Sequence, residues 1–532
     1  MNHRLLGSVA ALAVSAGAAQ ADYTLHVLHI NDFHSRIEAI NGNDSTCSAE
    51  DAAENKCFGG IARVATKVKE LRDSLTAAGQ NVIFVDAGDQ FQGSLMFTTY
   101  RGAVEAEFME LIKPDAMALG NHEFDDGPEG LGAFLDKVTF PVISGNLDVS
   151  QSNVLAGRVK NHVVLEIGGQ KIGIISALAT DTPETSSPGN AVIFQDDIDS
   201  LKADVAALEA EGVTKIIAVN HVGYNRDQAI AAAVPGIDAV VGGHSHTYLS
   251  ATDPKRAGAY PTWVSQESGA MVPVVQAYAY SKYLGHLELT FDDAGNLKYA
   301  GGNTILLDAS VTPDPAIEAR VKELAGPIEE LKAKVVADSA EAIDGSRESC
   351  RQVECQMGNL VAEAMLDRVK DQGVTIAIAN GGGLRASIDA GPVTMGEVLT
   401  VLPFQNTLST FTVTGADVVA ALENGVSQLE DGAGRFAQVA GLKYTFDAAA
   451  APGARVSDVM VKAGEEWAPI DPAAEYNLVS NNYVRGGGDG FKMFVNAKNA
   501  YDFGPDLADV TAEYLAKNAP YKPFLDGRIT KK

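Results

Sequence analysis

Five short segments of this sequence carry aspartate, asparagine and histidine at spacings that suit metal binding. The segments are Asp32-Phe33-His34, Asp86-Ala87-Gly88-Asp89, Gly120-Asn121-His122-Glu123-Phe124-Asp125, Asn220-His221 and Gly242-Gly243-His244-Ser245-His246. Imidazole and carboxylate ligands together suit divalent metals such as zinc or manganese. Two such ions that share one carboxylate can activate water and stabilise a phosphoryl group. The residue types therefore predict a two-metal site for phosphate-ester hydrolysis.

The spacing also divides the ligands between two ions. Asp32 and His34 are two residues apart, so on an extended segment both side chains would point to one ion. Asp89 suits the shared position. The expected ligands are Asp32, His34, Asp89 and His246 for one ion, and Asp89, Asn121, His221 and His244 for the other.

His122 is expected to meet the substrate rather than a metal. Adjacent side chains point in different directions, so Asn121 and His122 would not bind the same ion. His122 can then stabilise the phosphoryl oxygens or protonate the leaving oxygen, with Asp125 orienting its imidazole. The alternative for Asp125 is the N-cap of a helix before Pro128 and Gly130.

Each chemical segment follows an apolar run that reads as a strand, and the ends of such strands are where open α/β sheets bind ligands. A helix is expected over Ile61–Ala77 and a hairpin over Val163–Leu178. The strand-like runs are Tyr23–Ile30, Asn81–Val85, Ala116–Leu119, Lys215–Val219 and Ile237–Val241.

The chain of 532 residues is long enough for two domains. Residues 313–340 read as a charged linker helix interrupted at Pro327. A second α/β region should follow, so the fold class is α/β (α+β) with two domains. Its expected elements are a helix over Asn359–Val369, a strand over Val374–Ala379, a loop over Gly381–Gly383 and a helix near Met395–Val401.

The second region looks suited to recognition. The glycines after Asn380 allow close approach to a ligand, and Arg385 offers bidentate recognition of an anion. Phe404 and Tyr483, near glycine-rich loops, could stack on a flat base. The alternatives are a flexible turn for the glycines and core packing for the aromatic rings.

The N-terminus and the cysteines indicate export. Arg4, an apolar stretch and Ala19-Gln20-Ala21 predict a signal peptide over residues 1–21, the alternative being a membrane anchor. In an oxidising compartment, disulfides are expected for Cys47–Cys57 and Cys350–Cys355, the second holding Arg351 in its loop. The alternative is one zinc site built from all four cysteines. The charged C-terminus argues against a lipid-anchor tail.

A net charge of −28 argues against binding to nucleic acid or to an anionic membrane, both of which need basic surfaces. It also poses a question, because a phosphate substrate needs positive charge nearby. Bound cations can supply that charge.

The segments Leu28–Arg36, Gly120–Asp125 and Gly243–His246 resemble the calcineurin-like metallophosphoesterases and, more narrowly, the 5′-nucleotidase family. That family includes ecto-5′-nucleotidases and periplasmic UDP-sugar hydrolases. The resemblance implies a sandwich domain with helices outside, two divalent ions (zinc first, with manganese, magnesium, cobalt or calcium as alternatives) and a His122–Asp125 catalytic pair. His246 departs from the family pattern, where Asn or Gln is usual.

The resemblance extends to the second region and implies a nucleotide-binding domain. Phe404 and Tyr483 would sandwich the base, and Asp489 would bind the ribose hydroxyls. The remaining implied substrate contacts are Arg351, Asn380, Gly382 and Arg385. The implied divisions are 1–21 (signal), 22–312 (catalytic domain), 313–340 (linker helix) and 341–532 (substrate-binding domain).

The sequence thus predicts hydrolysis of nucleoside 5′-monophosphates, with a small-molecule nucleotide as partner and no membrane anchor. It makes no prediction of the oligomeric state. UDP-sugar hydrolysis and 2′,3′-cyclic phosphodiester hydrolysis are the alternatives within hydrolases. A secreted nucleotide-binding protein without catalysis is the alternative from another class.

Overall fold

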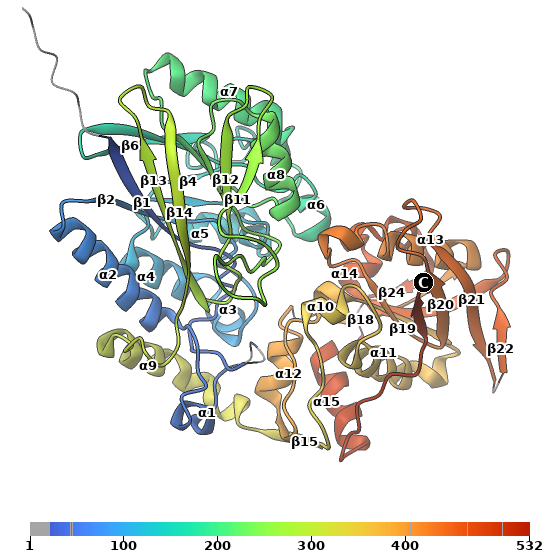
Figure 1. The fold of residues 1–532 in the computed structure, drawn as a ribbon. Coiled ribbons are helices and arrows are strands. Elements are labelled where there is room, and N and C mark those ends of the chain that lie inside the picture. The colour runs from blue at the N-terminus through green and yellow to red at the C-terminus, as the bar shows by residue number, and fades with distance from the viewer. Residues whose placement is uncertain (1–21, 43, 45, 405, 465, 503) are drawn as a thin grey trace, which may run out of the picture.

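The computed structural model describes residues 22–532 except 43, 45, 405, 465 and 503. The expected signal peptide over residues 1–21 lies outside the described residues. Figure 1 shows the blue-to-green first domain beside the orange-to-red second domain, with the segment that contains helix α9 running between them.

The first domain is built on two six-stranded sheets. Their strand orders are β14-β13-β1-β2-β3-β4 and β11-β12-β10-β9-β7-β6, and a short β5–β8 pair (Leu147–Asp148, Ile193–Phe194) stands apart. The first sheet contains β1 (Tyr23–Ile30), β2 (Asn81–Asp86), β3 (Ala116–Ala118), β4 (Val142–Ile143), β13 (Tyr283–Phe291) and β14 (Leu297–Leu306). The second contains β6 (His162–Ile167), β7 (Gln170–Ile175), β9 (Ile216–Val219), β10 (Ala239–Val241), β11 (Thr262–Ser265) and β12 (Met271–Val275).

Both faces of strand β1 are buried, which explains its nearly continuous apolar run. Leu25 and Val27 pack in the core between the two sheets, whereas Leu28 and Ile30 face the helices outside. Successive side chains of a strand point to opposite faces, so one strand serves both cores. The expected sandwich with outer helices is confirmed.

Helices cover both outer faces of this sandwich. The helix expected over Ile61–Ala77 is present at those bounds as α2, and the expected hairpin is the antiparallel pair β6–β7. The helices are α1 (Ala49–Ala53), α2 (Ile61–Ala77), α3 (Leu95–Tyr100), α4 (Ala103–Ile112), the 3-10 helix η1 (His122–Phe124), α5 (Gly127–Leu135), α6 (Thr182–Thr185), α7 (Asp197–Ala210) and α8 (Tyr224–Ala233).

Helix α9 (Pro315–Lys332) differs from the expected linker in two ways. It runs through Pro327 without interruption, because its packing against α2, α3 and α12 (Met395–Val401) outweighs the one backbone hydrogen bond that proline removes. It also ends before residue 340. The β-branched pair Val335-Val336 instead begins strand β15 (Val335–Ser339), which pairs with β17 (Gly391–Thr394) of the second domain.

The second domain contains a five-stranded sheet, β19-β16-β23-β18-β24, and a four-stranded sheet, β22-β21-β20-β25. The strands are β16 (Ile376–Asn380), β18 (Leu408–Thr414), β19 (Ala437–Ala440), β20 (Leu442–Phe446), β21 (Val456–Ala463), β22 (Glu466–Pro469), β23 (Glu475–Asn481), β24 (Lys498–Tyr501) and β25 (Ile529–Lys531). The helices are α10 (Arg347–Cys350), α11 (Gln356–Val369), η2 (Lys370–Gln372), η3 (Gly381–Gly383), α12, α13 (Gly415–Gly425), η4 (Leu429–Asp431), α14 (Asn482–Arg485), η5 (Gly488–Gly490), η6 (Lys492–Phe494) and α15 (Leu507–Lys517). The expected strand starts two residues later than predicted, and the expected helix at 359 starts three residues earlier.

Histidines buried in the first sheet predict a loss of stability in acid. Burial and the neighbouring His286 lower the pKa of His29 to about 3, and burial and His26 lower the pKa of His286 to about 4. As the pH falls, the unfolded chain binds protons at these histidines before the folded chain does. Their contribution to the free energy of unfolding is therefore full above about pH 6.5 and is lost progressively toward pH 4.

We expect His286→Gln to flatten this dependence by up to about 1 kcal/mol per pH unit between pH 6 and 4, after discounting for solvent screening. Urea unfolding at several pH values measures the slope. Equal slopes for the variant and the unsubstituted protein would contradict this prediction.

Candidate active site

The five chemical segments meet at the carboxyl ends of five strands. β1, β2 and β3 are parallel neighbours in the first sheet, and β9 and β10 are parallel neighbours in the second. Since carboxyl ends of parallel strands share one edge, the loops that follow them converge. The sequence-based expectation that the segments share this position is confirmed.

The ligand-bearing loops use a strained backbone. Asp32 and His34 have φ of 51° each and Asp89 has φ of 58°, while His244 and His246 have φ of 72° and 54°. Non-glycine residues rarely adopt this left-handed region, and functional sites are where such strain concentrates. The expectation that Asp32 and His34 converge on an extended segment is wrong. Strand β1 ends at Ile30, and left-handed turns bring the two side chains together.

Asp89 lies between the two halves of the cluster. Its Oδ2 is 3.6 Å from Nε2 of His34 and 3.1 Å from Nε2 of His221. Three buried or half-buried groups each bring three ligand atoms within 4.8 Å of one another: Asp32, His34 and His246; His34, Asp89 and His122; and Asp89, His221 and His244. Asp89 and His34 each belong to two of the three groups, and of these two only the carboxylate has a second oxygen with which to bridge two ions, so Asp89 suits the shared position.

The outer ligands also converge in pairs. On one side, Nε2 of His34 and Nε2 of His246 are 3.0 Å apart, and Nε2 of His246 is 3.2 Å from Oδ1 of Asp32. On the other side, Nδ1 of His244 is 2.9 Å from Oδ1 of Asn121. These contacts bring all seven expected ligands together.

The hydrogen bonds of two histidines fit the tautomer of a metal ligand. Nδ1 of His221 lies 2.6 Å from the Ala87 carbonyl oxygen, and Nδ1 of His34 lies 3.2 Å from the Phe91 carbonyl oxygen. A carbonyl accepts, so each Nδ1 carries the proton and each Nε2 presents a lone pair. Among the described residues, the nearest polar atom given for the buried Nε2 of His221 is Oδ2 of Asp89 at 3.1 Å, and no hydrogen bond of good geometry joins the two. An imidazole nitrogen that presents its lone pair beside a carboxylate fits a divalent cation.

The electrostatics of the histidines agree with this fit. Burial holds the pKa of His34, His244 and His246 well below the usual range, so these imidazoles are neutral and able to coordinate. Burial also lowers the pKa of His221, but Asp89 and Asp32 outweigh it and raise that pKa to about 10. The carboxylates thus attract positive charge to His221, which a cation can supply in place of a proton.

His122 and Asp125 form a pair beside the cluster. Nδ1 of His122 is 2.7 Å from Oδ2 of Asp125. Burial lowers the pKa of His122, but Asp125 and Asp89 outweigh that effect and raise it. Asp125 is not the N-cap of the helix that follows, because the N-cap of α5 is Asp126. The alternative weighed for Asp125 is therefore wrong.

Glu123 lies within the segment that the sequence singled out, yet it had no expected role. Its fully buried carboxylate accepts hydrogen bonds from four backbone N–H groups, those of Gly120, Asp89, Gln90 and Phe91, at 2.7 to 3.2 Å. It therefore ties the loop that carries Asp89 to the loop that carries Asn121. The only sequence signal was its place inside the Gly120–Asp125 segment, where its polar neighbours already had expected roles.

We expect Glu123→Gln to lower the free energy of unfolding by about 3 kcal/mol, because an amide cannot accept at both of its ends and leaves buried N–H groups unpaired. Urea unfolding measures the change. Glu129→Gln is the matched control, since Glu129 is exposed in the next helix. A loss no larger than that of the control would refute the proposed role of Glu123.

Residues of the second domain reach into the same site. Nη2 of Arg385 donates to Nε2 of His34 at 3.1 Å, and the Phe404 ring lies 6.0 Å from the His122 ring. The Arg385 guanidinium also lies over the Phe404 ring at 5.5 Å. The two domains are therefore closed around the metal-ligand cluster in this structure.

The other expected substrate residues gather nearby. Asn380 donates to Asp489 at 2.6 Å, and the Tyr483 hydroxyl is 3.3 Å from Asp489. A Cβ on Gly382 would lie 2.8 Å from Gly434, so only glycine fits that turn. Tyr483 packs one ring face against Gly488, a contact that the expected base sandwich did not include.

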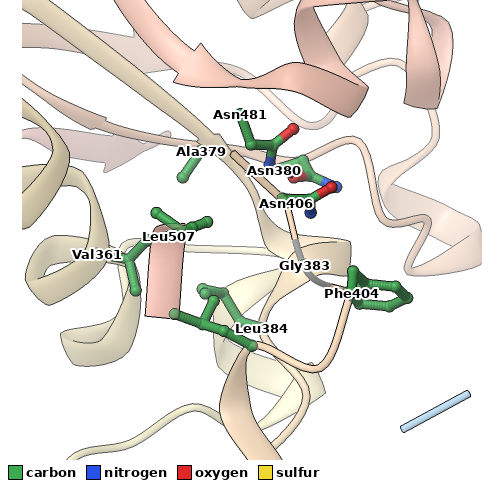
Figure 2. A pocket seen from close by; sticks show the side chains of 10 residues that line it. Val361, Ala379, Asn380, Gly383, Leu384, Phe404, Asn406, Asn481 and Leu507 are labelled. Carbon is green, nitrogen blue, oxygen red and sulfur yellow. Dashed lines mark hydrogen bonds between the residues drawn. The ribbon is translucent and has the colours of Figure 1, made fainter. Parts of the chain in front are cut away.

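Figure 2 shows a pocket beside Phe404, whose ring lies at one side of it. Asn380, Asn406 and Asn481 line one side, and leucine and valine side chains line the other. Asn481 donates to Asn380 at 3.0 Å, which links the pocket to Asp489. The asparagines form a polar wall that the sequence analysis recognised only in part.

The sequence also understated the arginines. Arg351 lies in the disulfide loop and is buried, and Arg36 and Arg347 join it and Arg385 near the cluster. Burial and the neighbouring Arg347 and Arg385 hold the pKa of Arg351 well below its usual range. Within the described part of the chain, the three guanidinium nitrogens of Arg36 have no hydrogen-bond partner. Clustered cations with unused donors suit an anionic ligand.

Tyr280 supports two expected ligands of one ion. Its ring packs edge-on against His246 at 5.1 Å and tilted against His34 at 5.7 Å, and its N–H donates to the Asp32 carbonyl. No motif in the sequence marked this residue, because a single aromatic after a strand is ordinary.

Both expected disulfides are present, Cys47–Cys57 and Cys350–Cys355. The alternative of a four-cysteine zinc site is therefore wrong. Gln438 fixes the second disulfide loop, since its amide nitrogen donates to the carbonyls of Cys350 and Val353. The loop that carries Arg351 is held from both sides.

Comparison with known proteins agrees with this geometry. Residues 25–248 match the calcineurin-like phosphoesterase family, and residues 333–496 match the 5′-nucleotidase C-terminal domain. The chain is 38% identical to the 5′-nucleotidase of Diplobatis ommata, over 97% of this chain and 91% of that protein. It is 37% identical to the 5′-nucleotidase of Homo sapiens, over 99% and 93%. The chain belongs to the 5′-nucleotidase family.

A solved structure supports the family membership. The 5′-nucleotidase precursor from Thermus thermophilus superposes with a TM-score of 0.90 at 40% identity, covering 96% of this chain and 99% of that one. As a member of the 5′-nucleotidase family with a metallophosphoesterase domain, the chain is a metal-dependent phosphoric monoester hydrolase that uses divalent ions. Within the described residues, no helix has the length and apolar character needed to cross a membrane.

Proposed function

We propose that this protein hydrolyses nucleoside 5′-monophosphates to the nucleoside and phosphate. The observation that carries the proposal is the closure of the second domain over the ligand cluster, with Arg385 at His34 and Phe404 at His122. An enzyme that only needed a phosphate group would not require a flat aromatic ring beside its catalytic histidine. The relatives named above are 5′-nucleotidases, which supports the same substrate class.

We assign the ligands as the sequence predicts, with zinc as the first candidate metal. One ion would be held by Asp32, His34, Asp89 and His246, and the other by Asp89, Asn121, His221 and His244. When bound, the two cations would supply charge for the phosphoryl oxygens and lower the pKa of an attacking water toward neutrality. Four imidazoles in the set favour zinc or manganese over calcium.

The chain's own residues complete the reaction. His122, hydrogen-bonded to Asp125, would donate a proton to the leaving 5′ oxygen or stabilise the phosphoryl oxygens. Arg351 and Arg385 would neutralise the phosphate from the side of the second domain. Closure of the domains excludes water from these charged groups, which strengthens their interactions.

The nucleoside would lie on the second domain. We assign the base to Phe404 and Tyr483, the ribose hydroxyls to Asp489, and supporting contacts to Asn380 and the Gly382 turn. Tyr483 is turned toward Gly488 and Asp489 in this structure, so its ring would shift to stack on a base. We further propose that the protein is exported to the periplasm or the medium after removal of residues 1–21.

A substrate panel tests the proposed function. Phosphate release from AMP, UDP-glucose and 2′,3′-cyclic AMP is measured with and without a chelator. We expect AMP to be the best substrate and the chelator to abolish its turnover. If UDP-glucose or the cyclic nucleotide is hydrolysed faster than AMP, the proposed substrate is wrong. If exhaustive chelation does not affect turnover, the metal assignment is wrong.

A further inference from the structure

Ser186 contacts the catalytic pair from outside the five chemical segments. Its Oγ donates to Oδ1 of Asp125 at 2.6 Å, on the carboxylate oxygen that His122 does not use. Gln92 donates to the other oxygen, Oδ2, at 3.2 Å. Asp125 is therefore fixed at both oxygens, and a hydrogen bond to a carboxylate is one of the stronger kinds.

The segment that carries Ser186 also touches the second domain. Helix α6 lies immediately before Ser186 and packs against η5, the turn that contains Asp489. Figure 1 shows α6 as the part of the first domain that extends toward the second, beside α14. Oδ2 of Asp181, which precedes α6, lies 3.9 Å from Arg435 of the second domain. The segment over 181–186 thus bridges the nucleoside side and the catalytic pair.

We propose that Ser186 is a positioning residue for the His122–Asp125 pair and that the packing of α6 against the Gly488–Gly490 turn holds it in place. Docking of the nucleoside-binding domain is thereby coupled to the orientation of the catalytic imidazole. This inference rests on the proposed hydrolysis of nucleoside monophosphates. The inference assigns a role to a residue that lies outside the five chemical segments.

Three variants test the positioning role. Ser186→Ala should lower kcat for AMP about tenfold, the effect expected from one lost hydrogen bond to a charged group, with KM little changed. Ser186→Thr keeps the hydroxyl and should restore most of the activity. Ser187→Ala is the matched control, because Ser187 is the exposed neighbour.

A second background separates positioning from a general effect on the fold. In a His122→Ala protein, the additional Ser186→Ala change should have almost no effect on the residual kcat, because Ser186 acts through His122. An equal tenfold loss in both backgrounds would overturn the positioning role.

The coupling is tested with two substrates. Ribose 5-phosphate has the same alkoxide leaving group as AMP but lacks the base that the second domain would hold, so Ser186→Ala should reduce its turnover much less than that of AMP. Equal losses with the two substrates would overturn the coupling. Hydrolysis of AMP by the unsubstituted protein is measured before any variant is compared. Failure of the unsubstituted protein to hydrolyse AMP would refute the proposed function itself.

Discussion

Asp89→Ala is expected to lower kcat by about 10³- to 10⁴-fold and to remove most of the bound metal. Among the residues that the structure describes, Asp89 is the one carboxylate that belongs to two of the candidate ligand groups, and its Oδ2 lies 3.6 Å from His34 and 3.1 Å from His221. A metal ion stabilises the charge of a phosphoryl transition state by several kcal/mol. A 10³- to 10⁴-fold loss of kcat corresponds to a transition-state barrier that is higher by about 4 to 6 kcal/mol. Phosphate release and elemental analysis of the purified protein measure the two effects.

Asp86→Asn is the matched control for this change. Asp86 is as buried as Asp89 and is the last residue of β2, the strand that precedes the loop carrying Asp89. Its carboxyl group accepts hydrogen bonds from the Gly88 N–H and the Gln90 amide. Burial and Glu123 hold the pKa of Asp86 well above its usual range, so a neutral side chain resembles its native form. The Gln90 amide can also rotate to accept from the new amide nitrogen, which the backbone N–H groups around Glu123 cannot do. We expect this variant to keep its metal. If Asp89→Ala also retained two ions per chain, the shared position would belong to another residue.

The fold was predictable wherever the apolar pattern of a segment matched a single type of secondary structure. β1 and α2 have the bounds that their sequence patterns predict, because β1 is a nearly continuous apolar run buried on both faces and α2 has apolar residues at helical spacing. The linker was less predictable. Proline normally ends a helix, but tertiary packing decides whether α9 continues past Pro327, and the start of β15 depends on a partner strand far along the chain.

The candidate site was predictable in its ligands and less so in its geometry. Residue types and their position after strands were sufficient to predict that Asp32 and His34 lie together. The left-handed turns that bring them together could not be predicted, because neither position is a glycine, the residue that usually marks such a turn. Glu123, Tyr280 and Ser186 were missed for a related reason. Each acts through a contact with a ligand or with Asp125, and such contacts depend on distances that only the folded chain defines.

The acidity of the chain also becomes intelligible in the folded state. A net charge of −28 would repel a nucleotide over most of the surface. Arginines of the second domain contact the expected metal ligands of the first, Arg385 at His34 and Arg347 at the His244 carbonyl, so the positive charge is concentrated where the phosphate would lie. The domain interface is therefore where we expect the phosphate of the substrate to bind.

His122→Ala is expected to lower kcat for AMP by about 10²- to 10⁴-fold, the usual contribution of a positioned acid or base, while the metal content is unchanged. The metal measurement is decisive, because the ligand atom of His122 also lies within 4.8 Å of those of His34 and Asp89, so it could bind an ion instead. His162→Ala is the matched control, since His162 forms a similar pair with Asp204 at 3.1 Å on strand β6, away from the site. Loss of one metal ion with His122→Ala would make His122 a ligand, and full activity would exclude it from proton transfer. A large loss of kcat with both ions retained is the result that the His122–Asp125 geometry requires.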